Sequence, residues 1–169
     1  VQVLASRQVG KSTVTAVKGV HTALFHPGSV TLLISPSLRQ SGELFRRSMA
    51  IYQDSGSLVP VENVSSLRVE LANGSRILSL PGKAETVRGF TADLVIIDEG
   101  AQVGDDLYRS LSPSLAVTGG RLIAISTPFG RRGWFFEEFD AGSHWRRFKV
   151  TADDCPRIDP AFLKTERSA

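Results

Sequence analysis

The sequence predicts a three-layer α/β fold, in which a mostly parallel central sheet is flanked by helices. Short apolar runs of strand length alternate with amphipathic stretches of helix length, which is the pattern of a parallel sheet covered on both faces. One region departs from this alternation. Between residues 67 and 80, two runs of alternating apolar and polar residues flank Asn73-Gly74, which predicts an added β-hairpin.

The N-terminal part of the chain predicts two strand–helix pairs. Apolar runs at residues 1–5 and 30–34 predict buried strands. Residues 11–25 predict the first helix, and the apolar residues expected on its inner face are Val14, Val17, Val20 and Leu24. Residues 38–52 predict the second helix. Its expected inner face carries Leu44, Phe45, Met49 and Tyr52, and its outer face carries Arg39, Arg46 and Arg47.

The C-terminal part continues the alternation after the hairpin. The expected strands are residues 94–97, 122–125 and 147–150, and the expected helices are residues 104–115 and 133–139. Acidic residues follow the first of these strands, and Ser126-Thr127-Pro128 follows the second.

The composition indicates one globular domain of ordinary size. The chain has 169 residues, of which 41% are hydrophobic and 22% are charged. Its net charge of +3 permits a nucleic-acid partner, but an ordinary solvated surface explains this charge equally well. The single cysteine, Cys155, excludes an internal disulfide and a cysteine-rich metal site. No apolar run is long enough to span a membrane, so no membrane partner is expected.

A phosphate-binding loop is predicted between the first strand and the first helix. In such a loop the backbone N–H groups surround the phosphates, a lysine reaches the β- and γ-phosphates, and a Ser or Thr binds Mg²⁺. The expected ATP-binding residues are Ser6, Arg7, Gln8, Val9, Gly10, Lys11, Ser12 and Thr13. The first glycine of the usual pattern is replaced by Ala5. Taken alone, Gly-Lys-Ser is common, and an ordinary helix N-terminus explains it as well.

An acidic pair at the end of a buried strand supports the phosphate loop. Residues 94–97 lead into Asp98-Glu99, which is the Walker B pattern. We expect Asp98, together with Ser12, to hold Mg²⁺, and Glu99 to orient or deprotonate the attacking water. Both motifs occur in the right order, so the sequence predicts a RecA-like P-loop ATPase of the class with an additional catalytic glutamate (ASCE). The adjacent glutamate favours a motor or helicase ATPase over small GTPases.

Three segments carry a family resemblance. Residues 6–13 contain Arg-Gln inside the phosphate loop, residues 87–93 (VRGFTAD) lead into the acidic strand, and residues 125–128 read Ile-Ser-Thr-Pro. In combination they resemble the large terminase subunit of tailed bacteriophages, the ATPase that packages viral DNA. Members of that family typically carry Arg-Gln in the loop and tolerate the loss of its first glycine.

The resemblance implies roles for further residues. Arg7 would sense the γ-phosphate or pair with the acidic site, which suits a guanidinium inside the loop. Arg88 matches an arginine finger presented to a neighbouring subunit, although a structural salt bridge explains the same residue. Ser126 and Thr127 look like the family's coupling motif, and the alternative is a simple turn closed by Pro128.

The resemblance also implies a domain organisation and a set of partners. Residues 1–150 would be the ATPase domain, N-terminally truncated so that the family's adenine-binding segment is missing. Residues 151–169 would be a linker toward an absent C-terminal nuclease domain, so the family's nuclease activity is not expected in this fragment. The implied partners are double-stranded DNA, a homo-oligomeric ring at a portal, and the small terminase subunit. The implied location is the host bacterial cytoplasm, with transient docking on the procapsid.

Two other functions fit parts of the pattern. A superfamily 2 helicase lobe also pairs a phosphate loop with Asp-Glu. A degenerate P-loop module for assembly or DNA binding would need no catalysis, but intact Lys11, Ser12, Asp98 and Glu99 argue against it.

Basic and aromatic residues also gather near the C-terminal end of the predicted domain. This combination occurs in nucleic-acid binding, but the spacing of the aromatic residues favours a core role. The aromatic residues are Trp134, Phe135, Phe136, Trp145 and Phe148, and the basic ones are Arg131, Arg132, Arg146, Arg147 and Lys149.

Overall fold

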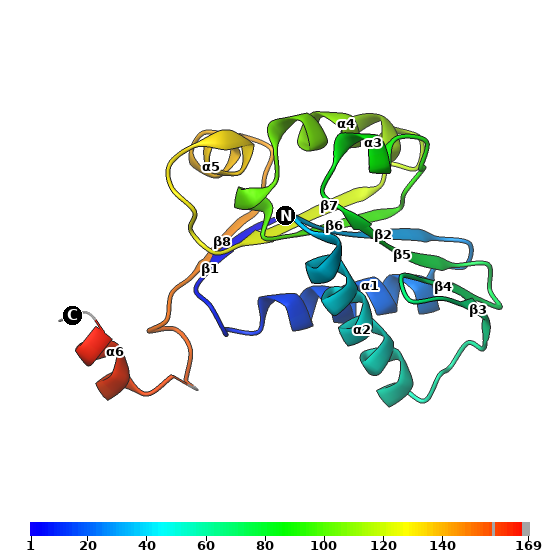
Figure 1. Ribbon diagram of the computed structural model, residues 1–169, viewed down its shortest axis with the longest axis horizontal. Coiled ribbons are helices and arrows are strands. Elements are labelled where there is room, and N and C mark those ends of the chain that lie inside the picture. The colour runs from blue at the N-terminus through cyan, green and yellow to red at the C-terminus, as the bar shows by residue number, and fades with distance from the viewer. Residues whose placement is uncertain (157, 167–169) are drawn as a thin grey trace.

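A single eight-stranded sheet organises the molecule in a computed structural model that describes residues 1–156 and 158–166 (Figure 1). The strand order is β3-β4-β5-β2-β6-β7-β1-β8. The strands are β1 (Gln2–Ala5), β2 (Val30–Ser35), β3 (Val61–Val64), β4 (Arg68–Leu71), β5 (Arg76–Pro81), β6 (Leu94–Asp98), β7 (Arg121–Ser126) and β8 (Arg147–Val150). All pairings are parallel except those of β4 with β3 and β5, so the mostly parallel sheet of the prediction is confirmed.

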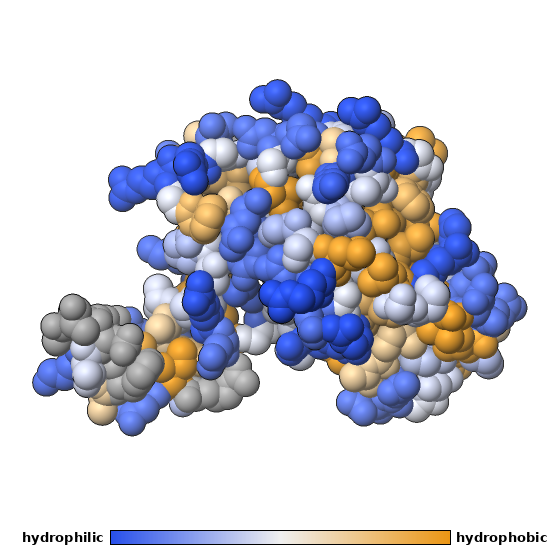
Figure 2. All heavy atoms as spheres, in the orientation of Figure 1, coloured by the Kyte–Doolittle hydropathy of each residue, from blue (hydrophilic) through white to orange (hydrophobic). Residues whose placement is uncertain are grey.

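Helices cover both faces of the sheet, which confirms the three-layer prediction (Figure 1). The first face carries α1 (Lys11–Phe25) and α2 (Leu38–Asp54), and the second carries α3 (Ala84–Val87), α4 (Asp105–Ala116) and α5 (Gly133–Asp140). A 3₁₀ turn (Gly100–Gln102) follows β6. The short α6 (Pro160–Glu166) ends a segment that leaves the sheet after β8, and in Figure 2 this segment stands apart from the main body. No helix in the described ranges is long and apolar enough to cross a membrane.

The central strands are apolar along their whole length because both of their faces are buried. In β2 and β6, alternate side chains enter two separate cores. The core under α1 and α2 contains Leu33, Leu94 and Ile96. The core under α3, α4 and α5 contains Leu32, Ile34, Val95 and Ile97. Burial on both faces fixes the positions of the central strands, and the predicted functional residues lie at the ends of these strands.

The predicted hairpin is present between β4 and β5. Asn73 accepts a hydrogen bond from the N–H of Ser75 (3.0 Å), and its side-chain amide donates to the carbonyl of Ala23 (2.9 Å). The hairpin turn is therefore attached to the end of α1. A third strand, β3, extends the hairpin at the sheet edge. The sequence did not predict it because all of its residues are exposed, so it lacks apolar alternation.

The predicted inner face of α1 is partly wrong. Val20 and Leu24 are buried as expected, but Val14 is 69% exposed and Val17 is 47% exposed. The helix instead turns small residues, including Ala16 and Gly19, toward the sheet. A Cβ on Gly19 would lie only 3.5 Å from Ile96 Cδ1, which shows how closely helix and sheet approach. Ala16 and Gly19 occupy this close contact, so Val14 and Val17 fall on the solvent side of the helix. The face predicted for α2 is confirmed, except that Met49 is only partly buried.

The aromatic residues near α5 divide between core and surface. Trp134 and Phe135 are buried, and the Trp134 ring stacks on Tyr108 with centroids 4.4 Å apart. The core prediction is therefore correct for these two, whereas Phe136 and Trp145 are only half-buried. It is wrong for Phe148, which is 43% exposed because β8 is an edge strand, and whose ring lies 5.2 Å from the Arg146 guanidinium.

The turn between α4 and β7 gives a test of this packing. A Cβ on Gly120 would overlap the carbonyl oxygen of Ala92 and lie 2.7 Å from Leu115 Cδ2. We therefore expect Gly120→Ala to lower the free energy of unfolding by about 1–3 kcal/mol in urea denaturation. The control is Gly42→Ala in α2, where the new Cβ has an ordinary 3.5 Å contact with Leu67. Alanine in a helix should be neutral or stabilising by up to roughly 1 kcal/mol. Equal unfolding midpoints for the two variants would contradict this account.

Candidate active site

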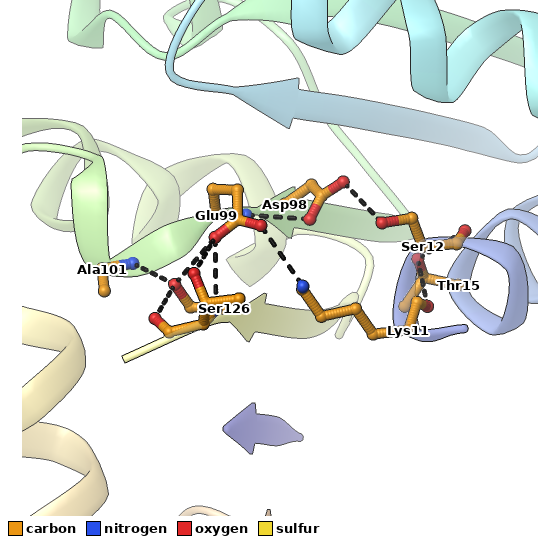
Figure 3. A network of polar contacts seen from close by, with 8 residues as sticks. Lys11, Ser12, Thr15, Asp98, Glu99, Ala101 and Ser126 are labelled. Atoms are coloured by element: carbon orange, nitrogen blue, oxygen red, sulfur yellow. Dashed lines mark hydrogen bonds and ion pairs between the residues drawn. The ribbon is translucent and has the colours of Figure 1, made fainter. Parts of the chain in front are cut away.

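The site forms where three neighbouring strands end at the same edge of the sheet. In the order β6-β7-β1, β7 lies between the strand that carries the acidic pair and the strand that precedes the phosphate loop. All three are parallel, so residues 6–10, the pair Asp98-Glu99 and the pair Ser126-Thr127 emerge side by side. Figure 3 shows Lys11, Asp98, Glu99 and Ser126 in one network of polar contacts.

The phosphate loop folds without its first glycine. Ala5 is the last residue of β1, where extended backbone accommodates a Cβ, and the next residue, Ser6, donates its N–H to the Val150 carbonyl (3.0 Å). The left-handed backbone lies further along, at Gln8 (φ 62°) and Gly10 (φ 90°). Glycine adopts this conformation without strain, so it is at Gly10, where α1 begins, that the loop needs one. Ala5 therefore lies at a position where the backbone does not need glycine.

Asp98 connects the acidic strand to the phosphate loop. Its Oδ2 accepts a hydrogen bond from the Ser12 hydroxyl (2.9 Å), and its Oδ1 accepts one from the N–H of Glu99 (2.9 Å). Burial raises the pKa of Asp98 above the ordinary value. The Ser12 hydrogen bond opposes this rise and the negative charge of Glu99 adds to it. Ser12 and Asp98 thus present a hydroxyl and a carboxylate oxygen together, which are ligand types that suit Mg²⁺.

Glu99 is held at both of its carboxylate oxygens. Oε1 lies 3.3 Å from Lys11 Nζ, and Oε2 accepts hydrogen bonds from the Thr127 hydroxyl (2.9 Å) and N–H (3.2 Å). Burial alone would raise its pKa, but the Thr127 N–H, the Lys11 charge and the Thr127 hydroxyl together lower it. The carboxylate is therefore ionised at neutral pH. Its backbone is left-handed (φ 51°), a conformation that costs free energy in a residue other than glycine and that often marks a functional site.

Ser126 and Thr127 link the end of β7 to this carboxylate. The Ser126 hydroxyl accepts a hydrogen bond from the N–H of Ala101 (3.2 Å), donates to the Thr127 carbonyl (2.8 Å) and lies 3.4 Å from Glu99 Oε2. Both predicted coupling residues therefore contact Glu99 directly, which a simple turn closed by Pro128 would not require.

A cavity of about 350 Å³ opens above the phosphate loop. Its lining residues are Gln8, Gly10, Lys11, Ser12, Thr13 and Arg47. Arg47 comes from α2, and its Nη1 donates a hydrogen bond to Thr13 Oγ1 (2.8 Å). The sequence placed Arg47 on the outer face of its helix. That face is exposed as predicted, but the packing of α2 beside α1 points this side chain at the loop.

The remaining predicted residues of the loop are less closely engaged. The side chain of Arg7 is exposed, and the ion pair with Glu99 is made by Lys11. Val9 is half-buried. The hydroxyl of Ser6 is buried and has no hydrogen-bond partner among the described residues. These positions leave the roles predicted for Arg7, Ser6 and Val9 as predictions.

Arg88 lies outside the phosphate-loop cavity. It is exposed, follows α3, and lines a separate cavity of about 680 Å³ between residues 88–91 and α4. Its neighbours there include Asp106, Arg109 and Pro113. Among the described residues no ion pair involves Arg88, so the structural salt bridge considered from the sequence is not present in this part of the chain.

The topology and the site define a class of protein. A parallel sheet whose phosphate-loop strand and acidic strand are separated by one further strand, with Lys11, Ser12, Asp98 and Glu99 at its edge, is a RecA-like P-loop fold.

The chain belongs to the family of large terminase subunits. Residues 3–157 match the family described as "Terminase large subunit, T4likevirus-type, N-terminal". The chain is 31% identical over 164 residues to the terminase large subunit of Escherichia phage T5, covering 91% of this chain and 37% of that protein. It thus spans about a third of the length of the curated relatives that it matches. Membership of this family sets aside the helicase alternative.

Solved structures agree with the fold. The large terminase ATPase domain of Thermus phage P74-26 superposes with a TM-score of 0.80 at 22% identity, covering 99% of this chain and 79% of that one. The large terminase of another thermophilic bacteriophage, in complex with ADP, gives a TM-score of 0.77 at 15% identity, covering 98% of this chain and 44% of that one.

The raised pKa of Asp98 predicts how stability depends on its charge. Because the pKa in the folded state is raised, Asp98 favours folding at acid pH, and this contribution is lost as pH rises through the folded pKa. At pH 7 the charged form therefore costs stability. Without nucleotide and Mg²⁺, we expect Asp98→Asn to be at least as stable as the wild type at pH 7 in urea denaturation, and its advantage to shrink as Asp98 becomes protonated below neutral pH. A less stable Asn variant at pH 7 would refute this electrostatic account.

Proposed function

We propose that this chain is the ATP-hydrolysing domain of a DNA-packaging motor, which converts ATP and water to ADP and phosphate and moves double-stranded viral DNA into a procapsid. The observation that carries the proposal is the convergence of Lys11, Ser12, Asp98 and Glu99 at one sheet edge. The family to which the chain belongs, and the ADP complex of the large terminase from a thermophilic bacteriophage, support a nucleotide as the ligand of this edge. The intact constellation argues against a degenerate, non-catalytic module.

Binding of ATP would rearrange the ion pair at the centre of the site. Lys11 now pairs with Glu99 Oε1 at 3.3 Å. The β- and γ-phosphates carry more negative charge than one carboxylate, so they would draw Lys11 away. Glu99 would keep its Oε2 contacts with Thr127, while Oε1 would become free to accept a proton from the attacking water. Nucleotide binding would thereby release the base and leave it oriented.

The Ser12 hydroxyl and the Asp98 carboxylate would hold Mg²⁺. When bound, this ion would neutralise part of the negative charge on the β- and γ-phosphate oxygens. The preference of Asp98 for a nearby positive charge follows from its burial beside Glu99. Arg7, at the exposed side of the loop, would approach the γ-phosphate once the nucleotide is in place.

The contacts of Glu99 could couple ATP hydrolysis to movement of neighbouring segments of the chain. Protonation or release of this carboxylate would change its bonds to Thr127 and its proximity to Ser126. Ser126 is in turn bonded to the N–H of Ala101, in the 3₁₀ turn after Glu99. The end of β7 and the turn after β6 would therefore respond together to the state of the nucleotide.

The proposal includes an assembly of several copies. Arg88 is exposed and lines a cavity that shares no lining residue with the cavity of its own phosphate loop, which suits a finger that acts on a neighbour's nucleotide. From its membership of the terminase family, we also propose that the protein forms a homo-oligomeric ring at a portal and works with the small terminase subunit. The ring would dock on a procapsid in the host cytoplasm. Residues 151–169, which include α6, would connect this domain to a nuclease domain.

Removing the proposed base should separate binding from hydrolysis. In the full-length protein we expect Glu99→Gln to bind ATP at least as well as wild type, because Lys11 loses its competing partner. Phosphate release should fall by ~10²–10⁴-fold. The control Lys11→Ala should lose both properties. Binding is measured with a fluorescent ATP analogue and hydrolysis by phosphate release. Normal turnover in either variant would refute the proposed site.

Mixed assemblies test whether Arg88 acts on a neighbour. Arg88→Ala alone should lose hydrolysis by ~10³-fold or more. Mixing it with Glu99→Gln should restore part of the activity, because an intact Arg88 from one subunit then meets an intact site on the next. A mixture no more active than its components would indicate that Arg88 acts within its own subunit.

A further inference from the structure

One residue that lines the cavity above the phosphate loop, the cationic Arg47, lies outside the sequence motifs. The other lining residues of this cavity come from the loop and the start of α1, whereas Arg47 comes from the middle of α2. The guanidinium reaches across to the first turn of α1, and its Nη1 donates to Thr13 Oγ1 at 2.8 Å. Arg47 is therefore held against the same helix N-terminus that would receive the phosphates.

The charge of Arg47 is not used elsewhere in the described part of the chain. No ion pair there involves Arg47, whereas its neighbour Arg46 pairs with Glu43 on the same helix. A guanidinium has five N–H donors in a fixed planar arrangement, and the bond to Thr13 uses one of them. The others remain able to bind an anion in a cavity that a helix N-terminus already favours for anions.

The position of Thr13 indicates which part of a nucleotide Arg47 would meet. With a nucleotide bound, Lys11 would reach the β- and γ-phosphates, and the Ser12 hydroxyl, which donates to Asp98, would hold the metal ion. The backbone of the loop and the start of the helix surround the α- and β-phosphates. Thr13 lies in this first turn, and it turns its hydroxyl toward α2, not toward the acidic pair. Its partner Arg47 therefore lies toward the α- and β-phosphates.

We propose that Arg47 is a further nucleotide-binding residue, whose guanidinium, positioned by Thr13, contacts the α- and β-phosphates. The inference rests on the proposed ATPase function and adds a residue that lies outside the motifs. These phosphates are common to ATP and ADP, so the contact is present before and after hydrolysis. A contact of this kind changes the affinity for both nucleotides and leaves the chemical step unchanged.

The test compares arginine variants in the full-length protein. Dissociation constants for fluorescent ATP and ADP analogues, KM and kcat are measured for Arg47→Ala, Arg47→Gln and Arg47→Lys. We expect Arg47→Ala and Arg47→Gln to weaken ATP and ADP binding in parallel by ~10-fold or more, as for the loss of a charge-assisted hydrogen bond. KM should rise to match, and kcat should stay within roughly twofold. Arg47→Lys should retain part of the affinity.

Arg46→Ala is the matched control. It removes the same side chain one position earlier on α2, where the arginine pairs with Glu43 outside the cavity, so nucleotide affinity should stay at the wild-type value. Thr13→Val should weaken binding less than Arg47→Ala. The double variant should resemble Arg47→Ala, because Thr13 acts in part through Arg47. If Arg47→Ala does not fold, Arg47→Gln and Arg47→Lys carry the same comparison.

The outcomes separate this inference from the proposed function. Wild-type affinity in all Arg47 variants, with normal ATP hydrolysis, would overturn the inference alone. Weakened ATP binding with unchanged ADP binding would also overturn it, because that result assigns Arg47 to the γ-phosphate. A kcat loss with unchanged ADP affinity would do the same. A wild-type protein that neither binds nor hydrolyses ATP would overturn the proposed function itself.

Discussion

The parallel pairing of β7 with both β1 and β6 is the constraint on which the site depends. Its register sets Leu4 opposite Ser126 and Asp98 opposite Ile125. Each of the three strands therefore ends within about one residue of its neighbour in the sheet. A shift of one residue along any of these strands would turn buried side chains toward the opposite core, so the two cores fix the register. The hydrophobic packing of the sheet in this way determines the distances between polar groups at its edge.

The same burial gives two adjacent carboxylates different properties. The pKa of Asp98 is raised, because burial outweighs its hydrogen bonds, and the pKa of Glu99 is lowered, because Thr127 and Lys11 outweigh burial. Opposite shifts in neighbouring acids commonly mark different chemical tasks. Asp98, beside the Ser12 hydroxyl, is suited to a cation. The negative charge of Glu99 is stabilised by Lys11 and Thr127, so Glu99 stays ionised, as a proton acceptor must be.

The site also extends beyond its motifs, into elements whose sequence carries no sign of it. Arg47 belongs to a helix that looks like an ordinary surface helix, with other arginines on the same outer face, and the hydrogen bond to Thr13 exists because α2 packs beside α1. Ser126 and Thr127 stand out more in the sequence, since they follow a buried strand. Only their bonds with Glu99 show that they contact the proposed base.

The sequence by itself determined the three-layer α/β class, the boundaries of most strands and helices, and the Asn73-Gly74 hairpin. It also predicted that Lys11, Ser12, Asp98 and Glu99 belong to one site, and the structure brings them into contact. These features can be predicted from short stretches of sequence, because apolar runs, turn residues and loop motifs act over a few neighbouring positions. The tertiary structure alone decided which face of α1 meets the sheet, that β3 extends the edge, that Phe148 is exposed and that Arg47 enters the cavity. Each of these depends on how closely two distant segments approach, and side-chain size and charge at one segment do not specify that distance.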